Sequence, residues 1–293
     1  MVGDCPSEIP GIQKHKLDIR ATLSKFASIA IEARMGVITL TTDLGHKDFY
    51  QAALKGSIIS QYPAVQLVDI SHDIPPFDIQ YAAFVVKNAY PYFPKHTVHL
   101  IGIDSVFNEN NRYLALKYNG HYFIGTDNGL FSLILDGPPT EAVEINIIQD
   151  LKYLHFPLTD IFTKAACHLA KGGKLTDIGD PVDGVVDRTL VQPVVERDSL
   201  RGSVVFIDSF GNVISNISKE LFNKVQKGRN FILYFRRNET IDQLSWHYNE
   251  VPEGEKLCLF GITNYLEIAI NKGNASGLLG LNKGDIIRVE FKK

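Results

Sequence analysis

The chain has 293 residues, of which only three are cysteine and one is tryptophan. Cys5, Cys167 and Cys258 cannot form a disulfide framework, and no two of them have the C-x-x-C spacing. We therefore expect a reducing, cytoplasmic compartment and no cysteine-bound zinc site. No run approaches the roughly 18 apolar residues of a membrane-spanning helix. The net charge is −3 and the basic residues are dispersed, so neither nucleic acid nor a membrane is an expected partner.

Three common catalytic signatures are also missing. The sequence contains no G-x-x-x-x-G-K-[ST] loop, no G-x-G-x-x-G after its first predicted strand and no G-x-S-x-G elbow. Phosphate-cradling nucleotide hydrolases and serine hydrolases are therefore disfavoured. Hydrophobic residues make up 45% of the chain and charged residues 22%, as in an ordinary folded protein.

The order of hydrophobic patterns predicts two domains. From residue 35, strand-like runs at 37–41, 66–70 and 96–103 alternate with helical patterns at 48–62 and 77–89. This alternation predicts an α/β domain over 35–190, with a mostly parallel sheet and helices on its faces. From about Val191 the pattern is β only, which predicts a smaller antiparallel β-barrel domain over 200–293.

Residues 1–34 differ from the rest of the chain. They contain one short apolar stretch at 26–31 that lies too late for a secretory signal. We expect an N-terminal extension that is poorly ordered, as termini usually are. The alternatives are a loosely attached helix, or a natural start at Met35.

Polar residues that directly follow predicted strands are the candidate ligand-binding groups, because ligands of open α/β sheets bind beyond the carboxyl ends of the strands. Asp43 follows the first strand and could accept hydrogen bonds from ribose hydroxyls, or could simply form a turn or a helix cap. Asp104 follows the third strand and could form an oriented pair with Arg112 across the loop between them. A purely structural ion pair would have the same sequence.

Two further segments are candidates. Phe77 follows two prolines and could stack on an aromatic ligand or pack in the core. Asp208 and Asn212 lie in a tight polar turn, where an Asn amide could recognise a purine edge or serve the turn alone. Asp69, His72 and Asp73 lack the spacing of metal ligands on a helix, so we expect no metal site.

The ordered set of motifs resembles the S-adenosyl-L-methionine (SAM) hydroxide adenosyltransferase family, the SAM hydrolases, whose relatives include fluorinases and chlorinases. The resemblance covers residues 35–293. The motifs are Thr-Thr-Asp-Leu-Gly at 41–45, Val-Asp-Ile-Ser-His-Asp-Ile-Pro-Pro at 68–76, Tyr-Phe-Pro at 92–94, Thr-Asp-Asn-Gly-Leu at 126–130, Asp-Ser-Phe-Gly-Asn at 208–212 and Leu-Glu-Ile-Ala-Ile-Asn-Lys-Gly-Asn-Ala at 266–275.

The resemblance implies attack at the ribose 5′ carbon of SAM with methionine as the leaving group. Water as nucleophile yields adenosine, and a halide yields a halogenated deoxyadenosine. SAM is the substrate, and no cofactor is implied. The family also implies a homotrimer, with sites between the N-terminal domain of one subunit and the C-terminal domain of the next.

The resemblance also implies a role for each matching residue. Asp43 would bind the ribose hydroxyls, and Asp104 with Arg112 would organise the attacking water. The other implied substrate-binding positions are Asp48, Tyr50 and Asp208 toward the methionine end, Phe77 and Phe156 at the walls, and Phe210, Asn212, Asn274 and Ala275 at the adenine.

The sequence departs from the family pattern at two places. Hydrolases read Asp-Pro-Gly-Val-Gly shortly before the Arg, whereas this chain lacks the glycines and has one extra residue before Arg112. Hydrolases also read Phe-His-Gly-Arg-Asp, and here Pro157 occupies the His position. His155 lies two residues earlier and, on a strand, would share that face, so it is a third candidate catalytic residue.

Three functions follow from these observations. The first is a SAM hydrolase that positions water with Asp104 and Arg112. The second is a SAM- or adenosine-binding protein without catalysis, which the missing His would explain. The third is a halide-using relative, disfavoured because the Asp104 carboxylate would repel a halide.

Overall fold

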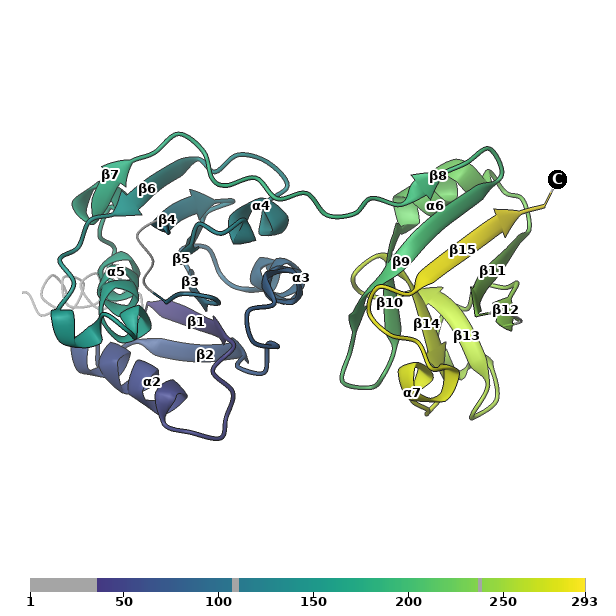
Figure 1. Ribbon diagram of the computed structural model, residues 1–293, viewed down its shortest axis with the longest axis horizontal. Helices are drawn as coiled ribbons and strands as arrows, with labels where there is room; N and C mark the ends of the chain where they lie inside the picture. The colour runs from purple at the N-terminus through teal and green to yellow at the C-terminus, as the bar shows by residue number, and fades with distance from the viewer. Residues whose placement is uncertain (1–35, 107–110, 237–238, 293) are drawn as a thin grey trace, which may run out of the picture. The chain divides into compact units, whose positions relative to one another are not determined.

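The computed structural model describes residues 36–106, 111–236 and 239–292, so the predicted extension over 1–34 lies outside the described residues. Two sheets organise this part of the chain (Figure 1). The first has the order β2-β1-β3-β5-β4-β6-β7. Its strands are β1 (Val37–Thr42), β2 (Gln66–Ser71), β3 (Val98–Gly102), β4 (Tyr113–Tyr118), β5 (His121–Thr126), β6 (Glu141–Ile145) and β7 (Gly179–Pro181).

Strands β2, β1, β3 and β5 run parallel, whereas β4, β6 and β7 extend the sheet in antiparallel fashion. The predicted mostly parallel sheet is thus confirmed. The β4–β5 hairpin forms at Asn119-Gly120, where both residues have positive φ angles of 49° and 78°. This left-handed conformation suits a two-residue Asn-Gly turn.

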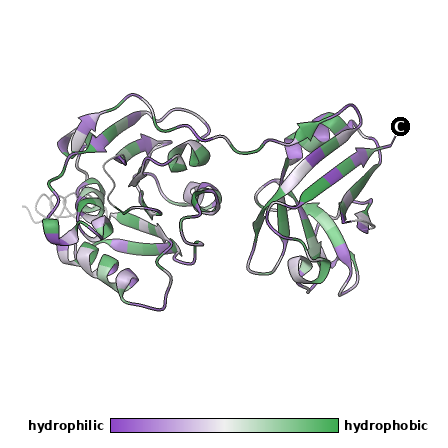
Figure 2. Cartoon of the chain, in the orientation of Figure 1, coloured by the Kyte–Doolittle hydropathy of each residue, from purple (hydrophilic) through white to green (hydrophobic). Residues whose placement is uncertain are grey.

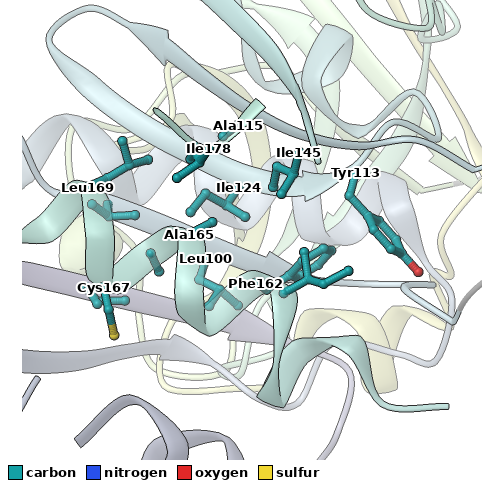
Figure 3. Packing of buried hydrophobic residues seen from close by; sticks show 14 of the residues in the cluster. Leu100, Tyr113, Ala115, Ile124, Ile145, Phe162, Ala165, Cys167, Leu169 and Ile178 are labelled. Carbon is teal, nitrogen blue, oxygen red and sulfur yellow. The ribbon is translucent and has the colours of Figure 1, made fainter. Parts of the chain in front are cut away.

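Helices cover both faces of the first sheet. Helices α2 (Tyr50–Gln61) and α5 (Ile161–Ala170) pack on one face, and α3 (Ile79–Ala89) and α4 (Leu130–Ile134) pack on the other. Figure 3 shows the core on the α5 side, where Phe162 packs at right angles to Tyr113, with 4.9 Å between the ring centres. None of the described helices is long and apolar enough to cross a membrane.

The second sheet is antiparallel and barrel-like, as predicted. Its order is β12-β11-β15-β9-β10-β14-β13, with β8 paired to β9. An ion pair between Lys256 of β13 and Glu239 of β12 joins the two ends of that order. The strands are β8 (Val194–Val195), β9 (Ser199–Ile207), β10 (Val213–Ser218), β11 (Phe231–Arg236), β12 (Glu239–Ile241), β13 (Lys256–Phe260), β14 (Tyr265–Ile270) and β15 (Ile286–Phe291).

Hydrophobic and hydrophilic residues mix along these strands (Figure 2), as expected when one face of a sheet is buried. The prediction of β structure alone after Val191 was wrong at two places, α6 (Lys219–Gln226) and α7 (Ala275–Leu279). The local chemistry explains both. The side chain of Ser218 accepts a hydrogen bond from the backbone N–H of Leu221, and that of Asn274 accepts one from Gly277, so each helix has an N-cap. The domain limits of 35–190 and 200–293 stay a prediction.

Candidate functional site

Three carboxylates lie at the carboxyl edge of the first sheet, the edge where its parallel strands end. Asp43 follows β1, Asp104 follows β3 by one residue, and Asp127 follows β5. These three strands are adjacent in the sheet. The strand-end argument predicted Asp43 and Asp104, and it would have found Asp127 had it been applied to the strand at 121–126.

Asp43 lies half-buried between two loops. Its Oδ2 accepts a hydrogen bond from the backbone N–H of Phe77 at 2.9 Å. Burial raises the pKa of the Asp43 carboxyl, and the nearby charge of Asp104 acts in the same direction, while backbone hydrogen bonds from Phe77 and Asp104 oppose the rise. The acid therefore has one oxygen fixed by the backbone and lies near a second carboxylate.

Phe77 itself has a φ of +63°, the left-handed region that bulky residues rarely adopt. The residue is 66% exposed. The core-packing alternative for Phe77 is therefore wrong. An exposed aromatic side chain on a backbone in this conformation, tied to Asp43, remains a candidate ligand contact.

The predicted pair of Asp104 and Arg112 is not what the structure contains. Nη2 of Arg112 lies 2.5 Å from Oδ2 of Asp127, and Oδ1 of Asp127 accepts a hydrogen bond from the backbone N–H of Val186 at 2.8 Å. The register of the hairpin explains this, because Tyr113 pairs with Thr126 and so places Arg112 beside Asp127. Asp104, with a φ of +48°, stands on the neighbouring strand end.

A small aromatic cluster lies at the start of α2. The Tyr50 and Phe156 rings meet edge to face at 5.3 Å, which brings a residue predicted at the methionine end against one predicted at a wall. Oδ1 of Asp48 accepts a hydrogen bond from the backbone N–H of Tyr50 at 3.2 Å. Asp48 and Tyr50 are both exposed and available to a ligand.

The argument that placed His155 beside the family His was wrong. It assumed a strand, whereas the segment consists of 3₁₀ turns at Leu151–Tyr153 and Pro157–Thr159. In these turns a spacing of two does not keep a common face. Pro157 is buried at the head of the second turn, and His155 is exposed between the two turns.

A second cluster lies on the antiparallel sheet, in the turn after β9. Oδ1 of Asp208 accepts hydrogen bonds from the backbone N–H groups of Phe210 and Asn212, at 2.9 and 2.8 Å. Its Oδ2 accepts from the Asn212 amide at 3.0 Å. The carboxylate therefore holds the turn together, and Phe210 stands at its tip with 77% of its surface exposed.

This turn opens onto a cavity of 650 Å³. Four predicted residues line it: Asp208, Phe210, Asn212 and Asn274. The buried Ala275, which begins α7, is not part of the lining. A cavity of this size can hold a small molecule.

The cavity also contains residues that the sequence analysis missed, chiefly Tyr248 and Lys272. The Tyr248 hydroxyl donates a hydrogen bond to Oε1 of the buried Glu267 at 2.7 Å. Burial raises the pKa of both groups, and the charge of Asp208 raises that of Glu267 further. Glu267 belongs to the 266–275 motif, whereas no motif marked Tyr248.

A metal centre was not an expected feature. Among the residues with described positions, no group of three or more His, Cys, Asp or Glu side chains is arranged to hold a metal ion. Asp69 and His72 instead contact each other and the side chains of Lys55 and Thr42.

Several known proteins resemble this chain in both sequence and fold. The SAM hydroxide adenosyltransferase N-terminal domain matches residues 38–179, and the C-terminal domain of that family matches residues 202–288. The (R)-S-adenosyl-L-methionine hydrolase of Salinispora tropica is 32% identical over 263 residues, spanning 86% of this chain and 97% of the relative. That of Methanocaldococcus jannaschii is 28% identical over 265 residues, spanning 88% of this chain and 97% of the relative.

More distant relatives include a fluorinase of Nocardia brasiliensis, which is 26% identical over 67% of this chain and 75% of its own length. Among solved structures, an uncharacterised conserved protein of Thermotoga maritima matches with a TM-score of 0.77 and 28% identity, over 86% of this chain and 99% of that one. The agreement extends over both sheets' sequence ranges, in chain order. The chain therefore belongs to the SAM hydroxide adenosyltransferase family.

Proposed function

We propose that this protein hydrolyses SAM at the ribose 5′ carbon to adenosine and L-methionine. The observation that supports this most directly is the position of two carboxylates, Asp43 and Asp104, after the ends of the adjacent parallel strands β1 and β3. Four relatives 28–32% identical to this chain have the name of SAM hydrolase.

The main task of the protein in this reaction is to align water with the 5′ carbon. The oxygen of water forms a bond to the 5′ carbon while the carbon–sulfur bond breaks, the electron pair stays on sulfur and the water loses a proton. The sulfonium leaves as a neutral thioether, so no acid has to protonate it. The site must hold water in line behind the 5′ carbon and remove its other solvent contacts.

Each candidate residue has a place in this scheme. Asp43 binds the ribose diol, and Phe77 packs beside the ribose. Asp104 orients the attacking water. Arg112, fixed by Asp127, supplies positive charge at the same edge of the sheet. Tyr50, Phe156 and Asp48 form the wall toward methionine.

The second cluster supplies the remaining contacts. Asp208 faces the methionine amine, and Phe210 and Asn212 bind the adenine, with the Asn274–Ala275 backbone beside them. We further propose a homotrimer whose sites combine the two clusters from different subunits. In each cluster one aromatic side chain, Phe77 or Phe210, is mostly exposed and so is accessible to a ligand that both clusters would share.

One observation favours a second candidate, binding of SAM or adenosine without turnover. Pro157 replaces the family His with a residue that has no titratable group, and it is buried in a 3₁₀ turn. In that case the protein would bind SAM or adenosine without hydrolysing SAM.

The test is to incubate the pure protein with SAM at low and high chloride and to identify products by chromatography and mass spectrometry. Adenosine and methionine in equal amounts, independent of chloride, support the hydrolase. Asp104→Asn should abolish turnover and leave SAM binding intact. SAM retained without product would establish the binding protein instead, and a chlorinated nucleoside would show a halogenase.

A further inference from the structure

The loop that holds Asp43 is fastened to His72 on both sides of the carboxylate. On one side, Oγ1 of Thr42 lies 2.6 Å from Nδ1 of His72. On the other, the backbone N–H of Gly45 donates to the carbonyl oxygen of His72 at 2.8 Å. Thr42 and His72 are buried, with 0% and 1% of their surfaces exposed.

The other ring nitrogen of His72 faces the ion pair between Asp69 and Lys55. Nε2 of His72 lies 3.1 Å from Oδ1 of Asp69, and the other oxygen of Asp69 accepts a hydrogen bond from Nζ of Lys55 at 2.5 Å. Burial acts to raise the pKa of Asp69, but Lys55 and His72 outweigh it and the pKa is lowered. Burial lowers the pKa of His72.

The contacts of the ring decide where its proton lies. A neutral imidazole has one ring proton, and Nε2, 3.1 Å from a carboxylate oxygen of Asp69, is the atom placed to hold it. Nδ1 is then an acceptor, and the Thr42 hydroxyl must donate to it. The lone pairs of that hydroxyl remain for the backbone N–H of Leu44, which lies 3.4 Å away.

This relay cannot be a nucleophilic triad, although it has the order hydroxyl, imidazole and carboxylate. The Thr42 residue is fully buried, so no substrate carbon can reach its oxygen. Burying a threonine and a histidine in this way is costly unless their polar atoms are partnered. The contacts of Thr42 and His72 therefore fix the backbone on either side of Asp43.

We propose that His72, held by Asp69, is a positioning residue that acts through Thr42 to aim the Asp43 carboxylate at the two hydroxyls of a ribose. This inference rests on the proposed function, because it needs a ribosyl ligand at Asp43. Thr42 fixes the chain before the carboxylate, and Gly45 fixes it after. The hydrogen bond from Phe77 then selects which oxygen faces away from the ligand.

The test compares adenosine with 2′-deoxyadenosine by titration calorimetry, because only adenosine offers both hydroxyls. We expect the wild-type protein to prefer adenosine by about 10-fold or more, the value of one charge-assisted hydrogen bond. Thr42→Val keeps the side-chain shape and removes the hydroxyl, so the preference should fall at least several-fold. Thr42→Ser restores the hydroxyl and should restore the preference.

A second pair of variants tests the same proposal if the Thr42 variants do not fold. Asp69→Asn lies on the more exposed side of the relay and should also reduce the preference, whereas Asp73→Asn, in the same loop but paired with His46, should not. A purely structural role would weaken both nucleosides equally. A folded Thr42→Val or Asp69→Asn protein with an unchanged preference overturns the assignment. If the wild-type protein binds neither nucleoside, turnover of SAM decides between two failures. No product overturns the proposed function, whereas product without nucleoside binding overturns this assignment alone.

Discussion

Oδ2 of Asp43 is hydrogen-bonded to the backbone N–H of Phe77 at 2.9 Å, which joins two loops that follow neighbouring parallel strands. One oxygen of the carboxylate is thereby oriented before any ligand arrives. The same bond holds the exposed Phe77 ring on its left-handed backbone beside the acid. A single contact thus positions both the Asp43 carboxylate and the Phe77 side chain, the two groups that we propose for the ribose.

Replacing Asp43 should reduce SAM binding severely. Asp43→Ala removes a charged acceptor for two hydroxyls and the partner of the Phe77 N–H, so we expect an affinity loss of about 100-fold. Asp43→Asn retains one carbonyl oxygen and should lose less. Titration of both variants with SAM measures this, with Asp180→Asn, an exposed residue of β7, as the unaffected control. Wild-type affinity in Asp43→Ala would exclude this residue from the site.

Asp127 should matter for turnover through Arg112. Its side chain is fully buried and holds both Arg112 and the backbone N–H of Val186. Asp127→Asn keeps an oxygen for Val186 but loses the ion pair, so Arg112 should become misaligned. We expect kcat to fall more than about 10-fold with KM changed by less than about threefold, as for an interaction made mainly in the transition state.

The matched control for that variant is Asp136→Asn, which breaks an exposed pair with Lys87 at the same 2.5 Å separation. It should leave both constants unchanged, because exposed ion pairs contribute little. If Asp127→Asn raises KM and spares kcat, Arg112 binds the substrate rather than assisting its reaction.

The strand-end argument predicted the place of the site but not its pairings. The alternation of strand-like and helical segments along the sequence predicts where β1 and β3 end, and therefore where Asp43 and Asp104 lie. It does not predict which strands are neighbours in the sheet. Arg112 meets Asp127 because β4 and β5 form a hairpin in a particular register.

Other features could not be predicted for a different reason. His72 looked like a weak metal ligand, because its neighbours Asp69 and Asp73 are the residues that sequence spacing shows. Its actual partner, Thr42, lies 30 residues away and is brought close by the parallel pairing of β1 and β2. The 3₁₀ turn after His155 begins at Pro157, and an argument from two-residue alternation takes no account of such a turn.

Gly211 should be essential to the second cluster. Its φ is +82°, and a Cβ there would lie 2.2 Å from Oδ1 of Asn274, the cap of α7. Gly211→Ala should therefore displace that cap and weaken adenosine binding at least about 10-fold, in addition to the ~1–2 kcal/mol cost of the left-handed backbone. Gly228 has a φ of +76° with no atom within 4 Å of the added Cβ.

Gly228→Ala thus isolates the cost of the backbone conformation alone. Urea unfolding of both variants should show a loss of about 1–2 kcal/mol for Gly228→Ala and a larger loss for Gly211→Ala. Adenosine titration should find the Gly228→Ala protein normal. If both substitutions change the adenosine affinity equally, the contact between the added Cβ and Asn274 does not affect binding.

A buried chain of histidines should make the fold sensitive to acid. Oγ1 of Thr39 lies 2.7 Å from Nδ1 of His99, and Nε2 of His99 lies 3.2 Å from Nδ1 of His121. Burial lowers the pKa of His99 to about 3 and that of His121 to about 4, and the positive charge of Lys95 adds to the effect at His121. Both rings are therefore neutral in the folded state at neutral pH.

The unfolded chain binds these protons near pH 6.5, so acid favours unfolding. The stability from both neutral rings is fully present above about pH 6.5 and is lost as the pH falls toward 4, by about 2 kcal/mol per histidine at about pH 5. His121→Asn removes one of these groups, and the difference in unfolding free energy between about pH 7.5 and pH 5 should shrink by about 2 kcal/mol. The exposed His247→Asn should leave it unchanged. A wild-type pH dependence in His121→Asn would mean that this ring stays protonatable in the folded protein.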